Sequence, residues 1–345
     1  MRDDNTPVPS SPTLPHGGDL SAAEALYGPP AQGWVDLSTG INPTPYPVGD
    51  IGGNAFSRLP EKAAMDDLLE AAQAYYAAPS LGTIVAAPGT QALIQWLPRL
   101  RPRSTVSVIS PTYGEHAHAW CQAGHDVVEA AAPDQAPEDT DVLVVVNPNN
   151  PDSTRYTPEE LLETGQQLAL QGGWLIVDEA FGDVTPGLSL AAHCQQDGII
   201  LLRSFGKFFG LAGLRLGFAL TSPEMAGRLN RALGPWAVAG PACEIGARAL
   251  RDKAWIEQTR AALAAGRRRL EALLVESGLD ITGGTDLFTT ARTGRAGTLH
   301  GHLAGAGIWT RIFPNQGDWI RFGQPGTDEH WRRLDAALKS WPAEI

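Results

Sequence analysis

The sequence predicts an α/β protein with a mostly parallel sheet covered by helices and, after it, a smaller α+β domain. Three observations indicate this fold class. Short apolar runs alternate with helical segments from about residue 80 to 220, as in chains that form parallel sheets. The run 142–146 is apolar throughout, which is typical of a strand buried on both faces. After Gly234-Pro235 the pattern changes to long amphipathic helices followed by short strands.

Each element of the first part has its own local signal. Apolar residues recur at helical spacing over 61–76, and an apolar run at 83–87 ends in the turn Pro88-Gly89. A helix over 90–97 is expected to stop at Pro98, and the proline at 158 suits the first turn of a helix over 158–170. We expect the other elements of this part to be a helix around 115–123 and strands at 105–109, 142–146, 174–177, 199–202 and 216–220.

The second part alternates differently. Long amphipathic helices are expected from about 240 to 278. Short strands at 287–290, 308–311 and 319–322 then alternate with helices near 298–305 and 328–340.

These patterns predict four regions along the chain. They are a flexible proline-rich tail at 1–15, an N-terminal segment at 16–50 that joins the small domain, a large domain at 51–234 and a C-terminal small domain at 235–345.

Composition excludes several classes of protein. The chain has 345 residues and a formal charge of -12, from 38 acidic and 26 basic side chains, which argues against partners such as nucleic acid or anionic membrane. It holds no apolar run of about 18 residues and no N-terminal apolar signal segment, so a cytoplasmic protein is expected. Its three cysteines lie far apart, which predicts neither a disulfide framework nor a metal site.

Polar residues follow the predicted strands at the points where these strands end. They are Gly89-Thr90-Gln91, Tyr113, the segment 147–150, Asp178, and Ser204 with Lys207. Ligands of open parallel sheets bind beyond the carboxyl ends of the strands. The convergence of these polar residues therefore predicts a site for a small polar aromatic ligand at this edge of the sheet.

Lys207 is the candidate nucleophile of this site. It lies just beyond an apolar strand among aromatic residues and glycines, where an amine loses hydration, its pKa falls and it can attack an aldehyde. Ser204 and Arg215, three residues before and eight after it, suit a phosphate dianion. Taken alone, Lys207 would more often be a surface lysine in a loop.

The other candidates also have two interpretations each. Asp178 could hold a protonated pyridine nitrogen or simply cap the segment that follows. The N–H groups of Gly89-Thr90-Gln91 could bind an anion, although strand–glycine–helix junctions are common. Asn150 could donate to a phenolate oxygen or satisfy a turn, and Tyr113 could stack on a flat ring or be a half-buried core residue.

Together these residues resemble a known family. The order and spacing of Asn-Pro near 150, the segment 178–181, Ser204-x-x-Lys207 and Arg215 are similar to those of the fold type I enzymes that depend on pyridoxal 5′-phosphate, in the aspartate aminotransferase superfamily. The resemblance covers His16 to about Ser340. The segments 16–18, 36–43, 58–60 and 89–94 most resemble the branch of L-threonine O-3-phosphate decarboxylases of cobalamin biosynthesis, relatives of the histidinol-phosphate aminotransferases.

The resemblance implies a role for each candidate toward pyridoxal 5′-phosphate. Lys207 would bind the cofactor aldehyde covalently, and Asp178 would keep the ring nitrogen protonated. Asn150 would bind the ring hydroxyl oxygen, and Tyr113 would stack on the ring. The phosphate-binding residues would be Gly89, Thr90, Gln91, Ser204 and Arg215.

The resemblance also implies a site for a small phosphorylated amino acid. Arg321 would bind its carboxylate and Arg311 its phosphate, although both could be surface arginines on alternating strand positions. Gly40 and Asn42 would lie in a loop that closes over the substrate, and His16 would reach the substrate phosphate.

Several positions depart from the family pattern, among them Asp19 and Asp152-Ser153, and two bear on the reaction. Phe181 replaces a tyrosine that touches the ring oxygen in many aminotransferases, and Leu59 replaces a tyrosine that often reaches the partner subunit's cofactor. The second departure weakens the aminotransferase interpretation.

The reaction implied by the closest branch is decarboxylation of L-threonine O-3-phosphate to (R)-1-amino-2-propanol O-2-phosphate. An aminotransferase of the histidinol-phosphate class acting on a phosphorylated or acidic amino substrate is the alternative. A non-catalytic nucleotide-binding protein would need G-x-G-x-x-G between a strand and a helix, but Gly305-Ala306-Gly307 is predicted to lie after a helix and before a strand. The family usually forms homodimers, so a homodimer is expected.

Overall fold

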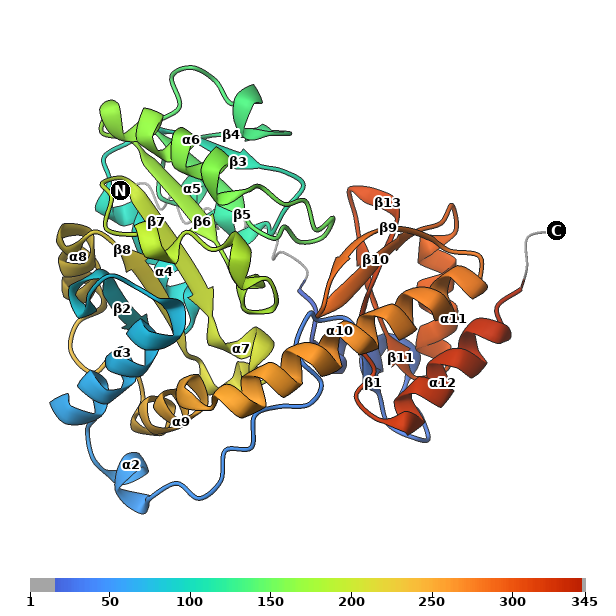
Figure 1. The fold of residues 1–345 in the computed structure, drawn as a ribbon. Helices are drawn as coiled ribbons and strands as arrows, with labels where there is room; N and C mark the ends of the chain where they lie inside the picture. Colours follow the sequence, from blue (N-terminus) through green and yellow to red (C-terminus); the bar gives the residue numbers. More distant parts are fainter. Residues whose placement is uncertain (1–15, 343–345) are drawn as a thin grey trace, which may run out of the picture.

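The computed structural model describes residues 16–342, and it confirms the predicted fold class. The tail expected at 1–15 lies outside the described residues. Figure 1 shows a large body and a smaller lobe beside each other, joined by one long helix and by the N-terminal part of the chain. The expected domain boundaries stay predictions.

The large body is built on a seven-stranded sheet in the order β2-β8-β7-β6-β5-β3-β4. Its strands are β2 (Ile84–Ala87), β3 (Thr105–Ile109), β4 (Asp126–Ala130), β5 (Val142–Val146), β6 (Trp174–Asp178), β7 (Ile199–Ser204) and β8 (Gly217–Thr221). Strands β4, β3, β5, β6 and β7 run parallel, and β8 runs antiparallel to both of its neighbours. The sheet is therefore mostly parallel, as expected.

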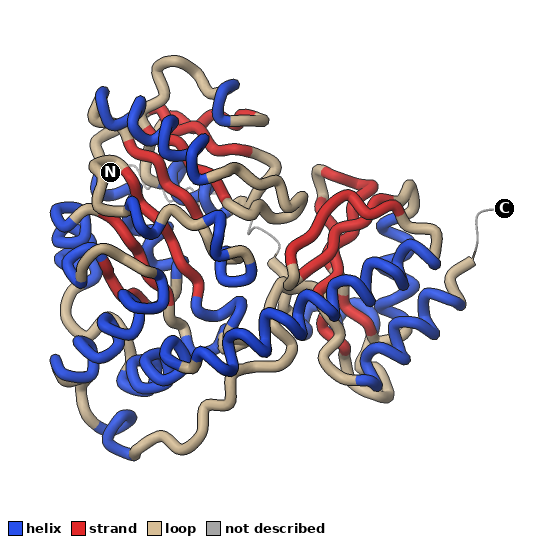
Figure 2. The backbone as a smooth tube through the Cα atoms, in the orientation of Figure 1, coloured by secondary structure: helices blue, strands red, loops and turns tan. Residues whose placement is uncertain are grey.

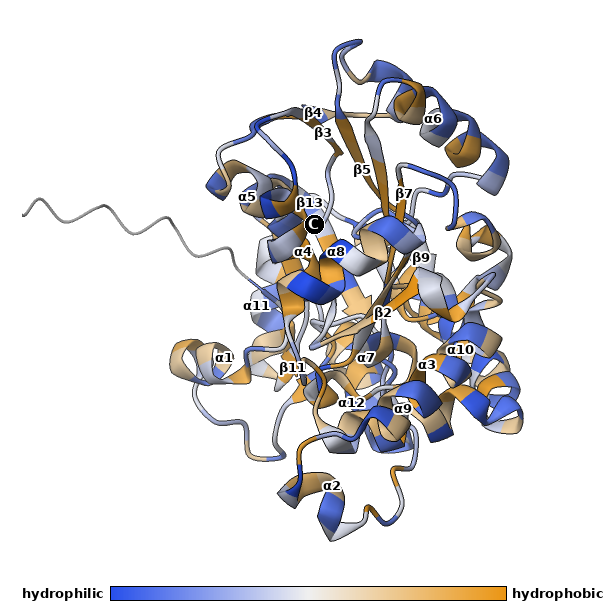
Figure 3. Ribbon diagram, turned by 90° about the vertical axis from the view of Figure 1, so that its left-hand side faces the viewer, coloured by the Kyte–Doolittle hydropathy of each residue, from blue (hydrophilic) through white to orange (hydrophobic). Residues whose placement is uncertain are grey.

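Helices cover both faces of this sheet because its central strands are apolar on both sides. The helices are α3 (Lys62–Tyr76), α4 (Thr90–Trp96), α5 (Glu115–Gln122), α6 (Pro158–Leu170), α7 (Phe205–Phe208), α8 (Pro223–Leu233) and α9 (Gly240–Arg251). Val142 and Val144 of β5 join one hydrophobic cluster with residues of α4, α5 and α8, whereas Leu143 and Val145 join another with residues of α3, α6 and α9. Figure 3 shows these strands as hydrophobic and the outer helices as striped.

The small lobe contains a four-stranded antiparallel sheet in the order β12-β13-β10-β9. These strands are β9 (Asp280–Thr285), β10 (Phe288–Arg292), β12 (Arg311–Phe313) and β13 (Gln316–Gly323), and the helices beside them are α11 (Ala296–Gly305) and α12 (Asp328–Lys339). The N-terminal segment contributes α1 (Leu20–Tyr27) and β1 (Val35–Asp36), and β1 pairs in parallel with β11 (Ile308–Trp309). The chain then crosses to the large body, where α2 (Gly53–Ser57) follows this segment.

One helix, α10 (Lys253–Glu276), belongs to both parts. Figure 2 shows it running from the large body along the small lobe. Its first half packs Ile256 and Leu263 into the core of the large body, and its second half packs Leu270 and Leu274 into the core of the small lobe. This arrangement sets the distance between the two parts.

Residues 16–342 contain neither a membrane-spanning helix nor a cluster of metal-binding side chains. No helix in this range is long and apolar enough to cross a membrane. No group of three or more His, Cys, Asp or Glu side chains in the same range is placed to hold a metal ion.

Candidate active site

The carboxyl ends of three neighbouring parallel strands bring the central candidates together. Val146, the last residue of β5, pairs with Asp178 at the end of β6, and Asp178 pairs with Leu202 of β7. Ser204 ends β7, and α7 begins with the next residue and carries Lys207. The strand order therefore places the predicted carboxylate and the predicted nucleophile at the same edge of the sheet.

Lys207 has the environment of a reactive amine. Its side chain is half-buried, and its ammonium lies 5.6 Å from the centre of the Phe181 ring. Burial, together with the positive charges of Arg321 and Arg215, lowers the pKa of Lys207 from 10.5 to about 8, although Asp178 acts in the opposite direction. Among residues 16–342 no carboxylate forms an ion pair with this ammonium. A larger fraction of the amine is thus neutral near pH 7 than for an exposed lysine.

Asp178 is buried and has its own partners. Its Oδ2 lies 2.9 Å from Nε2 of His116, and its Oδ1 accepts a hydrogen bond of 3.0 Å from the N–H of Ala180. His116 lies on α5 and is buried as well. Sequence analysis did not select His116. The signal in the sequence was its position three residues after the candidate Tyr113. In the structure the rings of the two residues lie 6.1 Å apart, edge to face.

The predicted phosphate-binding residues form a narrow cradle. Gly89 has φ +82°, and a Cβ there would lie 2.6 Å from Nη2 of Arg215. A Cβ on Gly217 would lie 2.6 Å from the backbone nitrogen of Thr90, at the start of α4. The first N–H groups of a helix have no partner within it, so they are available to an anion. A side chain on either glycine would clash with this arrangement, and binding of a phosphate by Thr90, Ser204 and Arg215 stays a prediction.

Arg321 is a buried cation held by two acceptors. It donates to Oδ1 of Asn150 and, at 2.6 Å, to the carbonyl of Ser38, whereas its Nε has no hydrogen-bond partner within the described residues. Burial and the nearby charge of Arg311 lower the pKa of Arg321 to about 9. The hydrogen bond links Asn150, a predicted cofactor ligand, directly to a predicted substrate ligand.

Arg311 lies beside Arg321 across two antiparallel strands. The two residues are direct partners in the register of β12 and β13. Like charges in this position repel each other. Arg311 is half-buried, which lowers its pKa. A ligand with two negative charges would relieve this repulsion, so the pair suits a substrate with two acidic groups.

The N-terminal segment closes the site from the small lobe. Gly40 leaves room for the ring of Phe181, since a Cβ at Gly40 would lie 2.8 Å from it. The side chain of Asn42 joins its loop to α7, because it donates to the carbonyl of Phe208 at 2.9 Å and accepts from the N–H of Thr44 at 2.9 Å. Its backbone N–H also donates to the carbonyl of Lys207. This gives Asn42 a positioning role, and its contact with substrate stays a prediction.

His16 joins the same site through a residue that sequence analysis missed. Its Nε2 lies 3.1 Å from Oε1 of Glu115, at the start of α5. The other oxygen of Glu115 accepts a hydrogen bond of 2.6 Å from Gln91. Tyr113 donates weakly to Gln91 over 3.4 Å, and burial raises the pKa of Tyr113 to about 12, so its hydroxyl keeps its proton. No sequence motif marks Glu115, whose partners come from distant segments.

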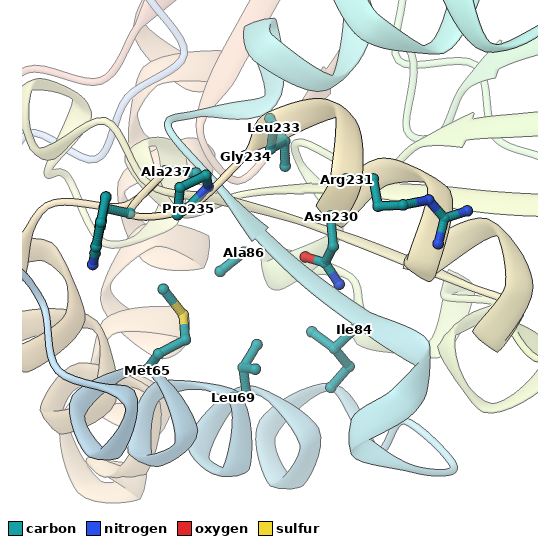
Figure 4. Close-up of a pocket in the computed structure, with 11 residues that line it drawn as sticks. Met65, Leu69, Ile84, Ala86, Asn230, Arg231, Leu233, Gly234, Pro235 and Ala237 are labelled. Carbon is teal, nitrogen blue, oxygen red and sulfur yellow. The ribbon is translucent and has the colours of Figure 1, made fainter.

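A separate cavity of about 460 Å³ lies elsewhere on the large body. It is bounded by α3, β2, α8 and the connection that follows α8, as Figure 4 shows, and Trp236 also lines it. None of the predicted site residues lines this cavity.

The residues present fit pyridoxal 5′-phosphate. The site offers an amine that forms no ion pair with a carboxylate among residues 16–342, a buried carboxylate and a cradle that side chains on two glycines would fill. Fold and site thus define an enzyme of the class that uses this cofactor.

Comparison with known proteins supports this class. The family model described as aminotransferase class I and II matches residues 63–298, and the chain belongs to this family. It is 48% identical to a threonine-phosphate decarboxylase from Pseudomonas aeruginosa over 94% of this chain and 97% of that protein. It is 42% identical to a threonine-phosphate decarboxylase from Sinorhizobium sp. over 95% of this chain and 98% of that protein.

A solved structure shares the fold. It is a histidinol-phosphate aminotransferase from Sinorhizobium meliloti in complex with pyridoxal-5′-phosphate, with a TM-score of 0.82 at 19% identity, covering 99% of both chains.

Proposed function

We propose that the chain is a pyridoxal 5′-phosphate-dependent decarboxylase that converts L-threonine O-3-phosphate to (R)-1-amino-2-propanol O-2-phosphate. The observation that carries this proposal is the 48% identity, over nearly the whole of both chains, to a threonine-phosphate decarboxylase. The paired guanidinium groups of Arg311 and Arg321 support it, because this substrate carries a carboxylate and a phosphate.

Five groups would hold the cofactor. Lys207 would bind its aldehyde, and Asp178, oriented by His116, would hold its ring nitrogen protonated. Tyr113 would lie against the ring, and Asn150 would bind the ring oxygen. The cradle beneath Gly89 would take the phosphate. When bound, the cofactor supplies an electron sink for the pair of electrons that a broken bond leaves on Cα.

The chain's own residues would orient the substrate and move the proton. Arg321 would bind the carboxylate and Arg311 the phosphate, so both ends of the substrate would be fixed from the small lobe. Which bond to Cα breaks depends on which one stands perpendicular to the cofactor ring, and positioning therefore decides the reaction. The amine of Lys207, with its pKa near 8, can both give and take a proton at Cα near neutral pH.

The assembly, pathway and compartment are also part of this proposal. We infer a homodimer in the cytoplasm that acts in cobalamin biosynthesis on a small phosphorylated amino acid, without nucleic acid or membrane partners. Three large apolar side chains on the surface of the large body support a subunit interface: Phe56 at 70% exposure, Leu59 at 63% and Trp236 at 58%.

A product assay tests the proposal. The purified chain is supplied with cofactor and L-threonine O-3-phosphate, without any 2-oxo acid, and carbon dioxide is measured beside a Lys207→Ala variant. We expect carbon dioxide from the unmodified chain only, and a cofactor adduct at Lys207 that reduction with borohydride makes permanent. A requirement for a 2-oxo acid would instead support the aminotransferase, and the absence of any adduct would overturn both.

A further inference from the structure

The long helix α10 contacts residues next to two elements of the site: α7, which carries the amine, and β13, which carries Arg321. Near its start, Trp255 stacks on Phe209 with ring centres 5.7 Å apart. Further along, its side chains join the core of the small lobe. Two contacts near the middle of α10 connect it to the active site from each side.

The first contact is made by Arg260. Its Nε donates to the carbonyl of Asp183 at 2.8 Å, and its Nη2 donates to the hydroxyl of Tyr75 at 3.3 Å. The guanidinium also lies 5.7 Å from the centre of the ring of Phe208, the residue directly after Lys207. Arg260 therefore fixes α10 against the helix that carries the amine.

The second contact is made by Gln324, the residue that follows β13. Its buried amide donates to the carbonyl of Leu263 on α10 and to the carbonyl of Asp286, both at 2.7 Å. A Cβ on Gly266 would lie 2.1 Å from the Gln324 side-chain oxygen. Glycine in the middle of a helix costs about 1 kcal/mol relative to alanine, so the close approach of Gln324 explains this residue.

These contacts form a continuous path between the two halves of the site. It runs from Phe208 to Arg260, along one turn of α10 to Leu263, across to Gln324, and back three residues along the chain to Arg321. We propose that Arg260 and Gln324 are positioning residues that fix the arginines of the small lobe relative to Lys207. They thereby select which bond at Cα lies in the reactive orientation. This inference rests on the proposed function for the identity of the two products.

The two orientations lead to different balanced reactions. When the bond to the carboxylate breaks, carbon dioxide leaves, its electron pair stays on Cα, and one proton replaces it in the amine product. When the bond to hydrogen breaks, the proton of Cα would move to the carbon of the cofactor that carried the aldehyde, and hydrolysis with one water would then release the phosphorylated 2-oxo acid and leave the amino group on the cofactor. The ratio of 2-oxo acid to carbon dioxide therefore reports orientation.

The test measures this ratio for the holoenzyme and for three variants. Arg260→Met removes the first contact, and Gly266→Ala displaces the amide of Gln324 from the second. Arg268→Met is the matched control, because this exposed arginine lies on the same helix and, among the described residues, forms no hydrogen bond or ion pair with Arg260, Gln324 or their partners. Misplacement of reacting groups by about 1 Å can lower a rate up to about 100-fold. We expect the first two variants to lower kcat/KM about tenfold and to raise the 2-oxo acid share about tenfold.

A second measurement separates positioning from general damage. Arg311 and Arg321 both belong to the small lobe, so the proposal requires that the cofactor-free variants bind L-threonine O-3-phosphate as tightly as the unmodified chain. Calorimetric titration measures this affinity, and thermal unfolding reports the fold. Weakened binding with an unchanged product ratio would overturn the inference in favour of a merely structural role. Arg260→Lys keeps the cation and is expected to give an intermediate ratio.

The outcome is distinct from that of the proposed function. If the unmodified chain releases no carbon dioxide and transfers the amino group instead, the proposed function fails. The inference would still require Arg260→Met and Gly266→Ala to shift the ratio away from that of the unmodified chain, and Arg268→Met to leave it unchanged. Equal ratios in all four proteins would refute it.

Discussion

The strongest electrostatic prediction concerns the protonation of Lys207 as pH changes. Its pKa is lowered to about 8, mainly by burial and then by Arg321. At pH 7 about one tenth of such an amine is neutral, against about one in three thousand for a lysine at 10.5, so the reactive fraction is about 300 times larger. This difference explains physically how a lysine can act as a nucleophile near neutral pH.

Competitive labelling of the cofactor-free chain measures this directly. The chain has four lysines, so peptide mapping after trace acetylation resolves each of them. Lys253, exposed at the start of α10, serves as the internal reference. We expect the labelling of Lys207 to rise with a midpoint near pH 8, well before the reference lysine.

Two substitutions give the sign of the effect. Two positive charges lower the pKa of Lys207, and that of Arg321 has the larger effect. Arg321→Met removes this charge and should raise the midpoint of labelling. Asp178→Asn removes the negative charge that favours the protonated amine and should lower it. A midpoint above pH 10 in the unmodified chain, or shifts of the opposite sign in the two variants, would refute the electrostatic reasoning.

Three further predictions follow from burial and close contact. The pKa of Lys207 is about 8 in the folded chain and 10.5 in the unfolded chain, so protonation of this amine opposes folding. Lys207→Met should therefore raise the free energy of unfolding of the cofactor-free chain at pH 7. Urea titrations should show this gain in stability disappearing as the pH rises from 8 to 10.5. Gly89→Ala should displace Arg215 and weaken cofactor binding at least tenfold in equilibrium dialysis. Glu179→Gln leaves Arg203 buried beside a single acid and should lower the free energy of unfolding by about 3–5 kcal/mol.

Each of these predictions has a matched control in the chain. Lys253→Met removes an exposed lysine and should not change stability between pH 7 and 10. Gly187→Ala adds a Cβ where nothing lies within 4 Å, so cofactor affinity should stay as it is. Asp126→Asn breaks an exposed ion pair with Arg103 and should lower the free energy of unfolding far less than Glu179→Gln does, because water screens exposed charges. Equal effects of a variant and its control would contradict the corresponding argument.

The elements that could be predicted from sequence are those whose burial leaves a pattern. β5 was predicted at its observed bounds because a strand buried on both faces must be apolar throughout. β4 and β9 were missed because they lie at the edges of their sheets: β4 contains two acidic residues and β9 two adjacent glycines. The antiparallel direction of β8 leaves no mark in composition, since direction depends on the connection and not on the strand itself.

The candidate site was predictable to the extent that its residues follow strand ends. Lys207, Asp178 and Asn150 occupy such positions, and the structure brings them to one edge of the sheet. His116 and Glu115 could not be found in this way because they lie on a helix and act through partners from other segments. Their hydrogen bonds are products of the tertiary structure.

The same strand ends that carry the chemistry also carry its support on the opposite face of the sheet. Asp178 meets His116 of α5 on one side, and the next residue, Glu179, accepts from Arg203 at 2.6 Å on the other. Arg203 in turn directly precedes Ser204 on β7. A strand alternates its side chains between faces, so this buried ion pair ties β6 to β7 one residue away from the groups that would hold the cofactor. The positions of the carboxylate and the amine are therefore fixed together, because any shift of one strand past the other would first have to separate two buried charges.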